Sequence, residues 1–276
     1  MIQLGLDTFL RHALAEDIGH GDITTQSCVP AGRQITGRVI AKEIGIICGL
    51  DVFCRVFALL DDTVTVTPQV ADGDCITAGT IIAELAGDAR AILQGERTAL
   101  NLLGHLSGIA TKTAEFVTQT AGTNAKICDT RKTTPGLRKL EKYAVTVGGG
   151  RNHRFGLYDG VLIKDNHITA AGGIANAVRA ARENIPHTIK IEVETETLAQ
   201  VEEALSAGAD SIMLDNMDTD TMTNAVRLIK NRAVTEASGN MDSRSVTKVA
   251  QTGVDFISIG ALTHSVKALD LSLRLN

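Results

Sequence analysis

The chain has 276 residues, of which 44% are hydrophobic and 21% are charged. This length predicts one large domain or two smaller ones, and the composition excludes a disordered, collagen-like or coiled-coil protein. Acidic residues outnumber basic residues by 32 to 27, whereas proteins that bind phosphate backbones are usually basic. With six Phe, two Tyr and no Trp, stacking platforms for single-stranded nucleic acid are not expected either. The composition therefore favours a small molecule, and no nucleic acid, as the partner.

The five cysteines are scattered along the chain and form no CxxC pair. This odd number and spacing argue against a disulfide framework or a zinc site and fit a reducing compartment. The first residues, MIQLGLDTFLRHALAED, lack the basic segment followed by an apolar run that marks a signal peptide. No apolar stretch approaches the roughly 20 residues needed to cross a bilayer. We therefore expect a cytoplasmic protein with no membrane partner.

Three patterns follow one another in the first 107 residues. Residues 1–20 have apolar residues at helical spacing and predict an amphipathic helix. Residues 36–85 are rich in β-branched residues and Gly, which predicts strands and tight turns. The turns resemble those of lipoyl or biotinyl carrier modules, but no Lys lies between Glu43 and Lys112 to carry such a group. Residues 88–107 predict a helix with a polar stripe, which either faces solvent or serves a site. The stripe consists of Gln94, Arg97, Asn101 and His105.

From about residue 124 onward, short apolar runs alternate with helical patterns, which predicts parallel βα units. Six such units are fewer than the eight of a full barrel. Either a further strand lies near 112–123 or the barrel is incomplete, and an open doubly wound sheet is the alternative. No G-x-G-x-x-G follows any of the runs, which argues against a dinucleotide site. The expected strands lie within 125–130, 160–166, 189–194, 211–216, 233–239 and 256–261, and the helices within 137–147, 174–184, 198–207, 219–230 and 243–252.

Each of the six runs ends in polar residues, and in a βα barrel the carboxyl ends of the strands meet on one face, where active sites are built. Polar residues also mark where strands leave the core, but that explains one or two ends better than six. We therefore expect a site at this face. The polar ends are Asp129, Arg131 and Lys132; Lys164, Asp165 and Asn166; Glu192 and Glu194; Asp215 and Asn216; Glu236 and Ser238; and Ser258.

Basic residues are concentrated in one segment. Residues 126–167 hold nine basic and four acidic residues, whereas the rest of the chain holds 18 basic and 28 acidic residues. Such a cationic cluster attracts an anionic substrate. Some of its members, Arg138, Lys139 and Lys142, fall within a predicted helix and could be a solvated face, whereas those at strand ends are harder to dismiss.

Two later strand ends carry the carboxylates Glu194 and Asp215. They form structural ion pairs with the cationic cluster, or they hold Mg²⁺, which proteins usually bind through one or two carboxylates together with substrate phosphates. The last two strands end in the segments Ser238–Asn240 and Ser258–Gly260, and loops at this end of a barrel commonly bind phosphate. The residues thus predict a pocket for a molecule with several anionic groups and a metal.

Segment 128–167 closely resembles the signature of the quinolinate phosphoribosyltransferase family (nicotinate-nucleotide pyrophosphorylases, carboxylating). The resemblance continues, in order and without large gaps, through 16–25, 95–111, 191–195, 212–216, 236–240 and 252–265. It implies an α/β fold with two domains. An N-terminal α/β sandwich domain would span 1–108 and pack with the tail 265–276, and a TIM-like incomplete parallel α/β barrel of six or seven strands would span 109–264.

The family transfers a phosphoribosyl group from phosphoribosyl pyrophosphate to the ring nitrogen of quinolinate in de novo NAD biosynthesis. The reaction requires Mg²⁺ and gives nicotinate mononucleotide, pyrophosphate and CO₂. The resemblance therefore implies a magnesium-dependent transferase that acts as a homodimer or a multiple of dimers. Within the same fold, a paralogue that acts on another anionic acceptor, such as the relatives found with molybdate-transport genes, is the alternative. A carrier module and a sugar-phosphate binder without activity are alternatives of other classes.

The resemblance also implies roles for individual residues. Lys132, Lys164, Glu194 and Asp215 would be catalytic, with Glu194 and Asp215 facing the ribose and the metal, directly or through substrate phosphates. Lys132 is the preferred donor of the proton that replaces the lost carboxylate. Arg97 would reach the site from the neighbouring subunit. The substrate-binding residues would be Arg97, Thr130, Arg131, Lys132, His153, Arg154, Lys164, Glu194, Asp215, Ser238, Gly239, Asn240, Ser258, Ile259 and Gly260.

Overall fold

The computed structural model describes residues 5–242 and 244–276. The chain divides into two compact units, one running up to Lys112 and including Val266–Asn276, and the other spanning Thr113–Ser265. The first is built on an antiparallel sheet and the second on a parallel sheet, so the expected α/β class is confirmed. Among the described residues, no helix is both long enough and apolar enough to cross a membrane.

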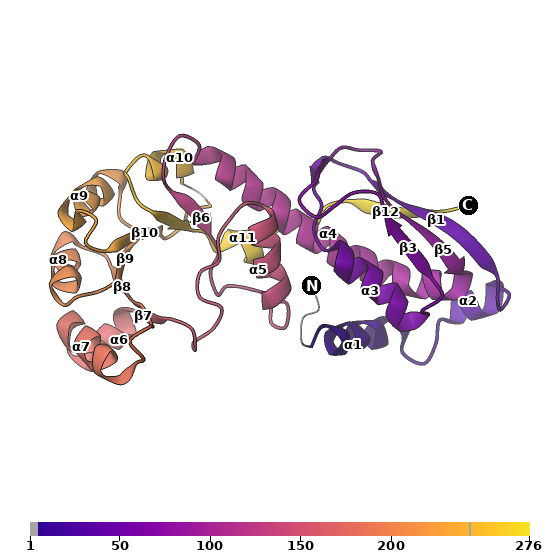
Figure 1. The fold of residues 1–276 in the computed structure, drawn as a ribbon, viewed down its shortest axis with the longest axis horizontal. Helices are drawn as coiled ribbons and strands as arrows, with labels where there is room; N and C mark the ends of the chain where they lie inside the picture. The colour runs from indigo at the N-terminus through magenta and orange to yellow at the C-terminus, as the bar shows by residue number, and fades with distance from the viewer. Residues whose placement is uncertain (1–4, 243) are drawn as a thin grey trace. The chain divides into compact units, whose positions relative to one another are not determined.

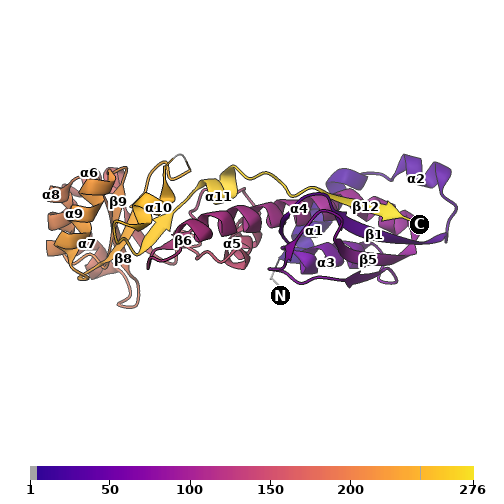
Figure 2. The ribbon, with the colours of Figure 1, turned by 90° about the horizontal axis from the view of Figure 1, so that it is seen from above.

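The first unit contains a four-stranded sheet with the order β12-β1-β5-β3 and a two-stranded sheet of β2 and β4. The C-terminal strand β12 pairs antiparallel with β1, from Gly37 opposite Leu275 to Ala41 opposite Leu271, and lies beside it in Figure 2. The strands are β1 (Gln34–Ala41), β2 (Gly45–Ile46), β3 (Thr65–Pro68), β4 (Cys75–Ile76), β5 (Ile81–Asp88) and β12 (Leu271–Leu275); the helices are α1 (Leu6–Ile18), α2 (Ile23–Cys28), α3 (Leu50–Leu60) and the start of α4 (Ala89–Gln119).

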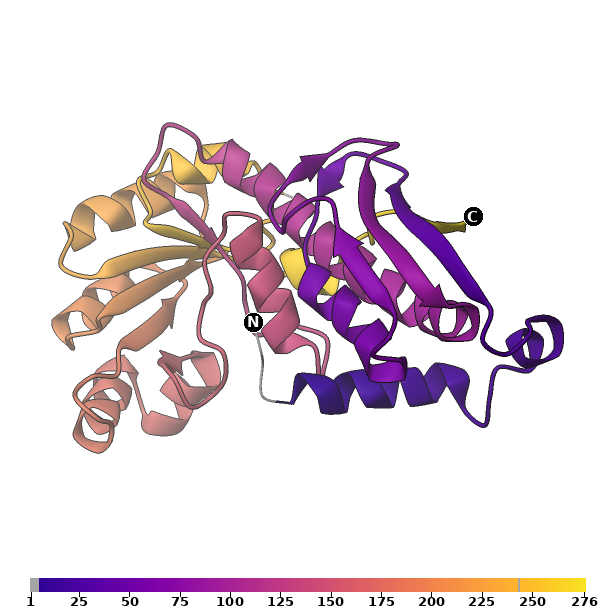
Figure 3. The same cartoon turned by 45° about the vertical axis from the view of Figure 1, so that its right-hand side comes forward.

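Helix α3 interrupts the region that the sequence predicted to contain only strands, and it packs against α1 (Figure 3). It buries Phe53, Val56 and Phe57, which lie three and four residues apart on one helical face. The residue before its N-terminus provides no side-chain cap. Instead, the Asp72 carboxylate accepts hydrogen bonds from the N–H groups of Gly49 and Leu50 at 3.0 and 3.1 Å. A cap supplied from so far along the chain leaves no local start signal, which explains why the helix was missed.

Helix α4 continues to Gln119. The possible extra strand near 112–123 is therefore wrong, since this region is helix followed by a turn. Gly104 and Gly108 let the C-terminal segment approach the helix closely: the Leu269 N–H donates to the Gly104 carbonyl at 2.9 Å. A Cβ at Gly108 would lie 2.2 Å from the carbonyl oxygen of Lys267, so this crossing admits no side chain.

The second unit is a curved parallel sheet with the order β6-β11-β10-β9-β8-β7 and with helices α7–α10 along its outer side (Figure 1). All six predicted strands are present, and the barrel is not closed. The strands are β6 (Lys126–Cys128), β7 (Val161–Ile163), β8 (Ile191–Thr195), β9 (Ser211–Asp215), β10 (Val234–Ser238) and β11 (Phe256–Ser258); the helices are α5 (Arg138–Val147), α6 (Asp165–Ala171), α7 (Ile174–Asn184), α8 (Leu198–Ser206), α9 (Thr219–Ile229), α10 (Val246–Ala250) and α11 (Ala261–His264).

Between α5 and β7 the chain pairs with the free edge of β6 through one isolated parallel bridge, from Cys128 to Arg151. The N–H of Arg151 donates to the Ile127 carbonyl at 2.8 Å, and the N–H of Asp129 donates to the Arg151 carbonyl at 3.1 Å. A single bridge thus stands beside β6 in place of a seventh strand. Smaller differences in this unit also concern helices: α6 and α11 were not predicted, and the helix expected over 243–252 begins at Val246, capped by Ser245. Ser243 lies outside the described residues.

Candidate active site at the carboxyl ends of the parallel strands

A cavity of 630 Å³ opens in the second unit at the carboxyl ends of the parallel strands. Every residue predicted to bind substrate lines it except Arg97, which lies on α4 in the first unit with a side chain 64% exposed. Asn216, Glu236 and His264 also line the cavity and had no predicted role. The predicted residues in the lining are Thr130, Arg131, Lys132, His153, Arg154, Lys164, Glu194, Asp215, Ser238, Gly239, Asn240, Ser258, Ile259 and Gly260.

A larger cavity of 920 Å³ lies at the opposite, amino-terminal ends of the same strands. Its lining includes Lys126, Asp210 and Asp255, which precede or begin strands. Asp210 is held by Arg182 at 2.8 Å, and Asp255 accepts a hydrogen bond from the N–H of Thr235 at 2.8 Å. These acids support the scaffold, and barrel enzymes place their chemistry at the other face. The smaller cavity is therefore the candidate site.

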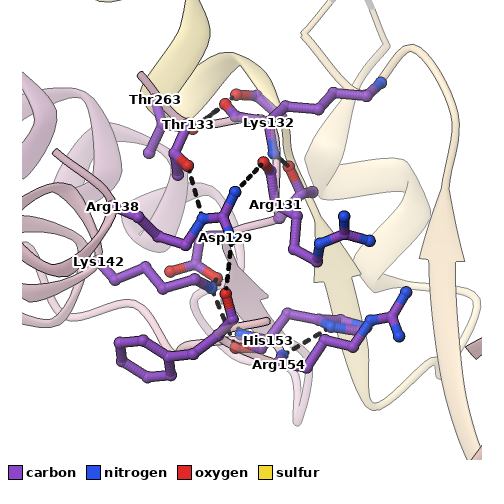
Figure 4. A network of polar contacts seen from close by, with 12 residues as sticks. Asp129, Arg131, Lys132, Thr133, Arg138, Lys142, His153, Arg154 and Thr263 are labelled. Carbon is purple, nitrogen blue, oxygen red and sulfur yellow. Dashed lines mark hydrogen bonds and ion pairs between the residues drawn. The ribbon is translucent and has the colours of Figure 1, made fainter. Parts of the chain in front are cut away.

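A buried ion pair between Asp129 and Lys142 supports one wall of this cavity (Figure 4). Both side chains are completely buried. Asp129 also accepts the backbone N–H of His153 at 2.9 Å, and Lys142 donates to the His153 carbonyl at 3.0 Å. Burial raises the pKa of Asp129 to about 6, although the Lys142 ammonium opposes the rise. The pair therefore fixes the backbone of His153 from both sides.

Arg138 connects the segments on either side of α5 (Figure 4). Its Nε donates to the Thr133 hydroxyl at 2.9 Å, and its Nη1 donates to the Phe155 carbonyl at 3.0 Å. The sequence left Arg138 and Lys142 as possible members of a solvated helix face. The structure shows instead that both face inward and hold the loops that carry the cationic site residues, whereas Lys139 is exposed.

Arg131 and Arg154 bring two guanidinium groups to the cavity wall. Among the described residues, no group accepts a hydrogen bond from the buried Nε of either arginine. Burial, together with the nearby Arg131 charge, lowers the pKa of Arg154. Buried donors without acceptors and two cations close together are both unfavourable unless an anion binds between them. The arrangement therefore suits a ligand with carboxylate groups.

Glu194 and Asp215 lie at the ends of the neighbouring strands β8 and β9. Glu194 forms an ion pair with Lys164, and Asp215 accepts a hydrogen bond from the Asn216 side chain at 2.6 Å. Asn216 in turn accepts from Asn240 at 3.2 Å. Two carboxylates at adjacent strand ends, beside loops suited to phosphate, fit the oxygen ligands that Mg²⁺ takes from proteins.

The floor of the cavity holds a cluster of His153, Glu192 and Glu236. The Nε2 atom of His153 lies 2.9 Å from Glu192 and 3.6 Å from Glu236, and the backbone N–H of Arg154 donates to Nδ1 at 2.8 Å. Burial works to lower the pKa of His153, but the two carboxylates raise it. The hydrogen bond that Nδ1 accepts favours the tautomer with its proton on Nε2, directed at the two carboxylates.

Glu236 is the most perturbed acid of the cluster. Burial, and then the charge of Glu192, raise the pKa of Glu236 to about 8, since two buried carboxylates this close do not both ionise. The ligand atoms of the three residues lie within 4.8 Å of one another, the spacing of a metal site. Nδ1 of His153 already accepts the Arg154 N–H, and a hydrogen on Nε2 would occupy the other nitrogen, so no lone pair of the ring remains for a metal. A proton held by Glu236 therefore explains the close approach of the two carboxylates better than a metal does.

The sequence did contain a signal for this cluster. Glu192 and Glu236 each stand two residues before another polar strand end, so each pair shares one face of its strand. Glu192 faces inward with Glu194, and Glu236 with Ser238, below the cavity that both strands line.

Comparisons with known proteins place the chain in a family. Residues 22–107 match the sequence profile of the quinolinate phosphoribosyl transferase N-terminal domain, and residues 109–274 match that of the C-terminal domain. The chain belongs to the quinolinate phosphoribosyltransferase family.

Members of the quinolinate phosphoribosyltransferase family are similar to this chain over nearly all of its length. A Bacillus subtilis protein described as a probable nicotinate-nucleotide pyrophosphorylase (carboxylating) is 50% identical over 273 residues, 99% of this chain and 94% of the relative. The Arabidopsis thaliana chloroplastic nicotinate-nucleotide pyrophosphorylase (carboxylating) is 44% identical over 98% of this chain and 83% of its own length. The solved structure of NadC from Streptococcus pyogenes superposes with a TM-score of 0.96 at 44% identity, covering 100% of this chain and 98% of that chain.

We predict that Lys142→Met lowers the free energy of unfolding by about 3–5 kcal/mol, because it leaves the buried Asp129 carboxylate without its cation. Urea unfolding at neutral pH measures the change. Lys139→Met, at an exposed position of the same helix, should change stability by less than about 0.5 kcal/mol. Adding Asp129→Asn to Lys142→Met should restore much of the loss. Wild-type stability of Lys142→Met alone would contradict this account of the ion pair.

The raised pKa of Glu236 predicts a pH dependence of stability. The native state keeps this proton up to about pH 8, whereas the unfolded state releases it near the ordinary value of 4.5. Because the native state binds more protons between these values, stability falls with rising pH, by at most about 1.4 kcal/mol per pH unit. Glu236→Gln removes this contribution. Its stability relative to wild type should therefore increase from pH 5 to pH 8 in urea unfolding, and parallel pH curves would show that Glu236 does not hold a proton.

Proposed function

We propose that the chain catalyses phosphoribosyl transfer from phosphoribosyl pyrophosphate to quinolinate with loss of CO₂, which gives nicotinate mononucleotide and pyrophosphate. The observation that carries this proposal is the pair of half-buried arginines Arg131 and Arg154, whose buried Nε atoms have no partner among the described residues and whose guanidinium groups line one cavity. Quinolinate carries two carboxylates, and planar guanidinium groups bind carboxylates through paired hydrogen bonds. The curated relatives bear names of this same reaction.

Arg131, Arg154 and Lys164 would hold the acceptor by its carboxylates. The hydrogen bond from Arg154 to the Gly160 carbonyl, at 3.0 Å, occupies one edge of that guanidinium and fixes its plane. His153 would support the acceptor from the floor of the cavity, and Thr130 from the end of β6. Holding the ring nitrogen still next to the donor converts a bimolecular encounter into an oriented reaction.

Glu194 and Asp215 would face the ribose. Loss of pyrophosphate leaves positive charge on the sugar, as in glycoside cleavage, and carboxylates aimed at that position stabilise it. Mg²⁺, when bound here with the substrate phosphates, would neutralise the leaving pyrophosphate. Lys132 and Lys164 would also approach the donor. Since Lys164 is paired with Glu194 before substrate binds, phosphate groups would compete for its ammonium.

The segments Ser238–Asn240 and Ser258–Gly260 would hold the 5′-phosphate. Gly239 and Asn240 both have positive φ, at 94° and 52°. A Cβ at Gly239 would lie 2.2 Å from the side-chain oxygen of Asn216, so only glycine fits beside this amide. Asn216 thereby joins the phosphate segment to Asp215, through its hydrogen bonds to Asp215 and Asn240.

The first test mixes the protein with quinolinate, phosphoribosyl pyrophosphate and Mg²⁺ and measures CO₂ and mononucleotide. We expect both products in equal amounts and kcat/KM for nicotinate at least about 100-fold lower, because nicotinate leaves one guanidinium group with a buried, unpartnered Nε atom. Glu194→Ala and Asp215→Ala should lower kcat far more than they weaken quinolinate binding. Comparable use of nicotinate would defeat the two-carboxylate assignment, and transfer to a different anion instead of quinolinate would favour a paralogous activity.

Arg97 would complete the cavity of a neighbouring subunit in a homodimer or a multiple of dimers. It lies on the polar stripe of α4 and is exposed, and the resemblance to the family supports an arginine contributed by the neighbouring subunit. Arg97→Ala and Lys132→Ala should each be nearly inactive. After subunit exchange in a mixture of the two, half of the dimers are mixed and each has one intact site, so roughly a quarter of wild-type activity should return.

Size-exclusion chromatography of tagged and untagged subunits verifies the exchange. If the mixture stays inactive although exchange is complete, Arg97 acts within its own subunit or only structurally. The single variants, each incubated alone in the same way, are the controls.

We also propose a cytoplasmic location for the enzyme. All five cysteines have free thiols, and burial raises the pKa of Cys54 to about 11. Thiols in this state need no oxidising compartment.

A further inference from the structure

The proposed reaction needs a proton in its last step. When the carboxylate next to the ribosylated nitrogen leaves as CO₂, its bonding electrons stay on the ring carbon. That carbanion must take up a proton to give the product. Lys132 was the candidate from sequence, but it is exposed, and its side chain extends along Gly260, where a Cβ would meet the Lys132 Cδ at 3.0 Å.

Glu236 lies in a different setting. It comes from β10, lines the cavity and has a side chain only 6% exposed. Among the described residues, none forms a hydrogen bond with its Oε1 atom. A buried ionised carboxylate would need several donors, so a carboxyl group with a bare oxygen at a cavity floor is better suited to the neutral acid.

The surrounding charges favour the neutral acid as well. Glu192, on β8, accepts hydrogen bonds from His153 and from the Ser211 hydroxyl at 2.9 Å each, and these contacts suit a carboxylate. The Ser258 hydroxyl and the His153 ring work in the other direction but do not outweigh burial and Glu192. The titratable groups around Glu236 are Glu192 on β8, His153 on the loop before β7, Cys128 and Asp129 at the end of β6, and Lys142 on α5.

We propose that the neutral carboxyl group of Glu236 is the general acid that protonates the ring carbon after decarboxylation. This inference rests on the proposed function. In the step, the bond from the ring carbon to the carboxylate breaks, CO₂ leaves, and the electron pair remains on the carbon beside the cationic nitrogen. This pair then forms a bond to the Glu236 proton, and the O–H electrons stay on Glu236 as a carboxylate.

The cluster also returns Glu236 to its starting state. After the transfer, the new carboxylate faces Glu192 with both groups buried, which favours uptake of a proton from solvent once product leaves. The His153 Nε2 atom, 3.6 Å from Glu236, stabilises the carboxylate until then. An acid whose pKa lies near the working pH is protonated before the step and still a good donor during it, which an ammonium group is not.

The test is single-turnover release of labelled CO₂, from quinolinate labelled in the carboxyl group next to the nitrogen, with phosphoribosyl pyrophosphate and Mg²⁺. The appearance of nicotinate mononucleotide is followed in parallel. Glu236→Gln keeps the shape and neutrality of the acid but cannot give up a proton. We expect it to form the mononucleotide about 10²–10⁴-fold more slowly than wild type while the Kd for quinolinate changes less than about threefold. Glu236→Asp, which keeps an acid, should recover part of the rate.

The pH profile separates an acid from a merely structural group. The wild-type single-turnover rate should fall on the alkaline side with an apparent pKa near 8, and Glu236→Gln should lose this limb. Glu192→Gln removes the charge that raises the pKa of Glu236, so it should move the alkaline limb to lower pH. A structural role would leave the position of the limb unchanged in Glu192→Gln.

The outcomes are distinct. If wild type releases no CO₂, the proposed function is wrong, and this inference is wrong with it. If wild type is active but Glu236→Gln keeps its rate within about fivefold and keeps the alkaline limb, the function stands and Glu236 is not the acid. Loss of quinolinate binding with an unchanged rate of bound substrate would likewise overturn the inference.

Discussion

The buried ion pair between Asp129 and Lys142 is the interaction on which the cavity depends. It joins the end of β6 to α5, and its two charges hold the backbone of His153 by the N–H and by the carbonyl. Such a pair is not an efficient source of stability, because desolvation offsets most of the attraction. Its value here is geometric: the segment that carries His153 and Arg154 makes only one β-bridge, so no strand ladder fixes it.

In the cavity beside this ion pair, cationic side chains lie at the walls and acidic side chains lie at the base. Cationic groups of Arg131, Arg154 and Lys164 form its walls, and Glu236 lies at its floor. The second acid, Glu192, is buried behind the floor, in contact with His153. The cationic walls favour anions. At the floor, the proton that Glu236 keeps and the adjacent His153 ring reduce the repulsion between the two carboxylates. A ligand with carboxylates at its rim and a reacting carbon at its centre meets both parts. This separation of cationic walls from an acidic floor would be lost if each acid formed an ion pair with a base.

Much of this arrangement could be predicted from the sequence, since strand ends that pool polar residues follow from the βα alternation alone. The six strands and the cavity residues at their ends were predicted this way, whereas His153 and Arg154, which follow no strand, were assigned from the resemblance to the family. The resemblance also supplied the roles of the strand-end residues. Helix α3 was missed because its cap, Asp72, comes from a distant loop. The positions of Arg138 and Lys142 were left open because helical periodicity does not tell which polar face turns inward. Glu192 and Glu236 needed the structure, because protonation depends on distances between different strands.

The single bridge at Arg151 also has a consequence for how such a pocket changes over evolutionary time. A residue in a full strand is constrained by both neighbouring strands, so altering it disturbs the sheet. The segment that follows Arg151 is held by the charges of Asp129, Lys142 and Arg138, and these can stay in place while the exposed part of the loop is replaced. Acceptor preference can therefore drift through this segment while the sheet, the phosphate loops and the acidic floor are inherited unchanged.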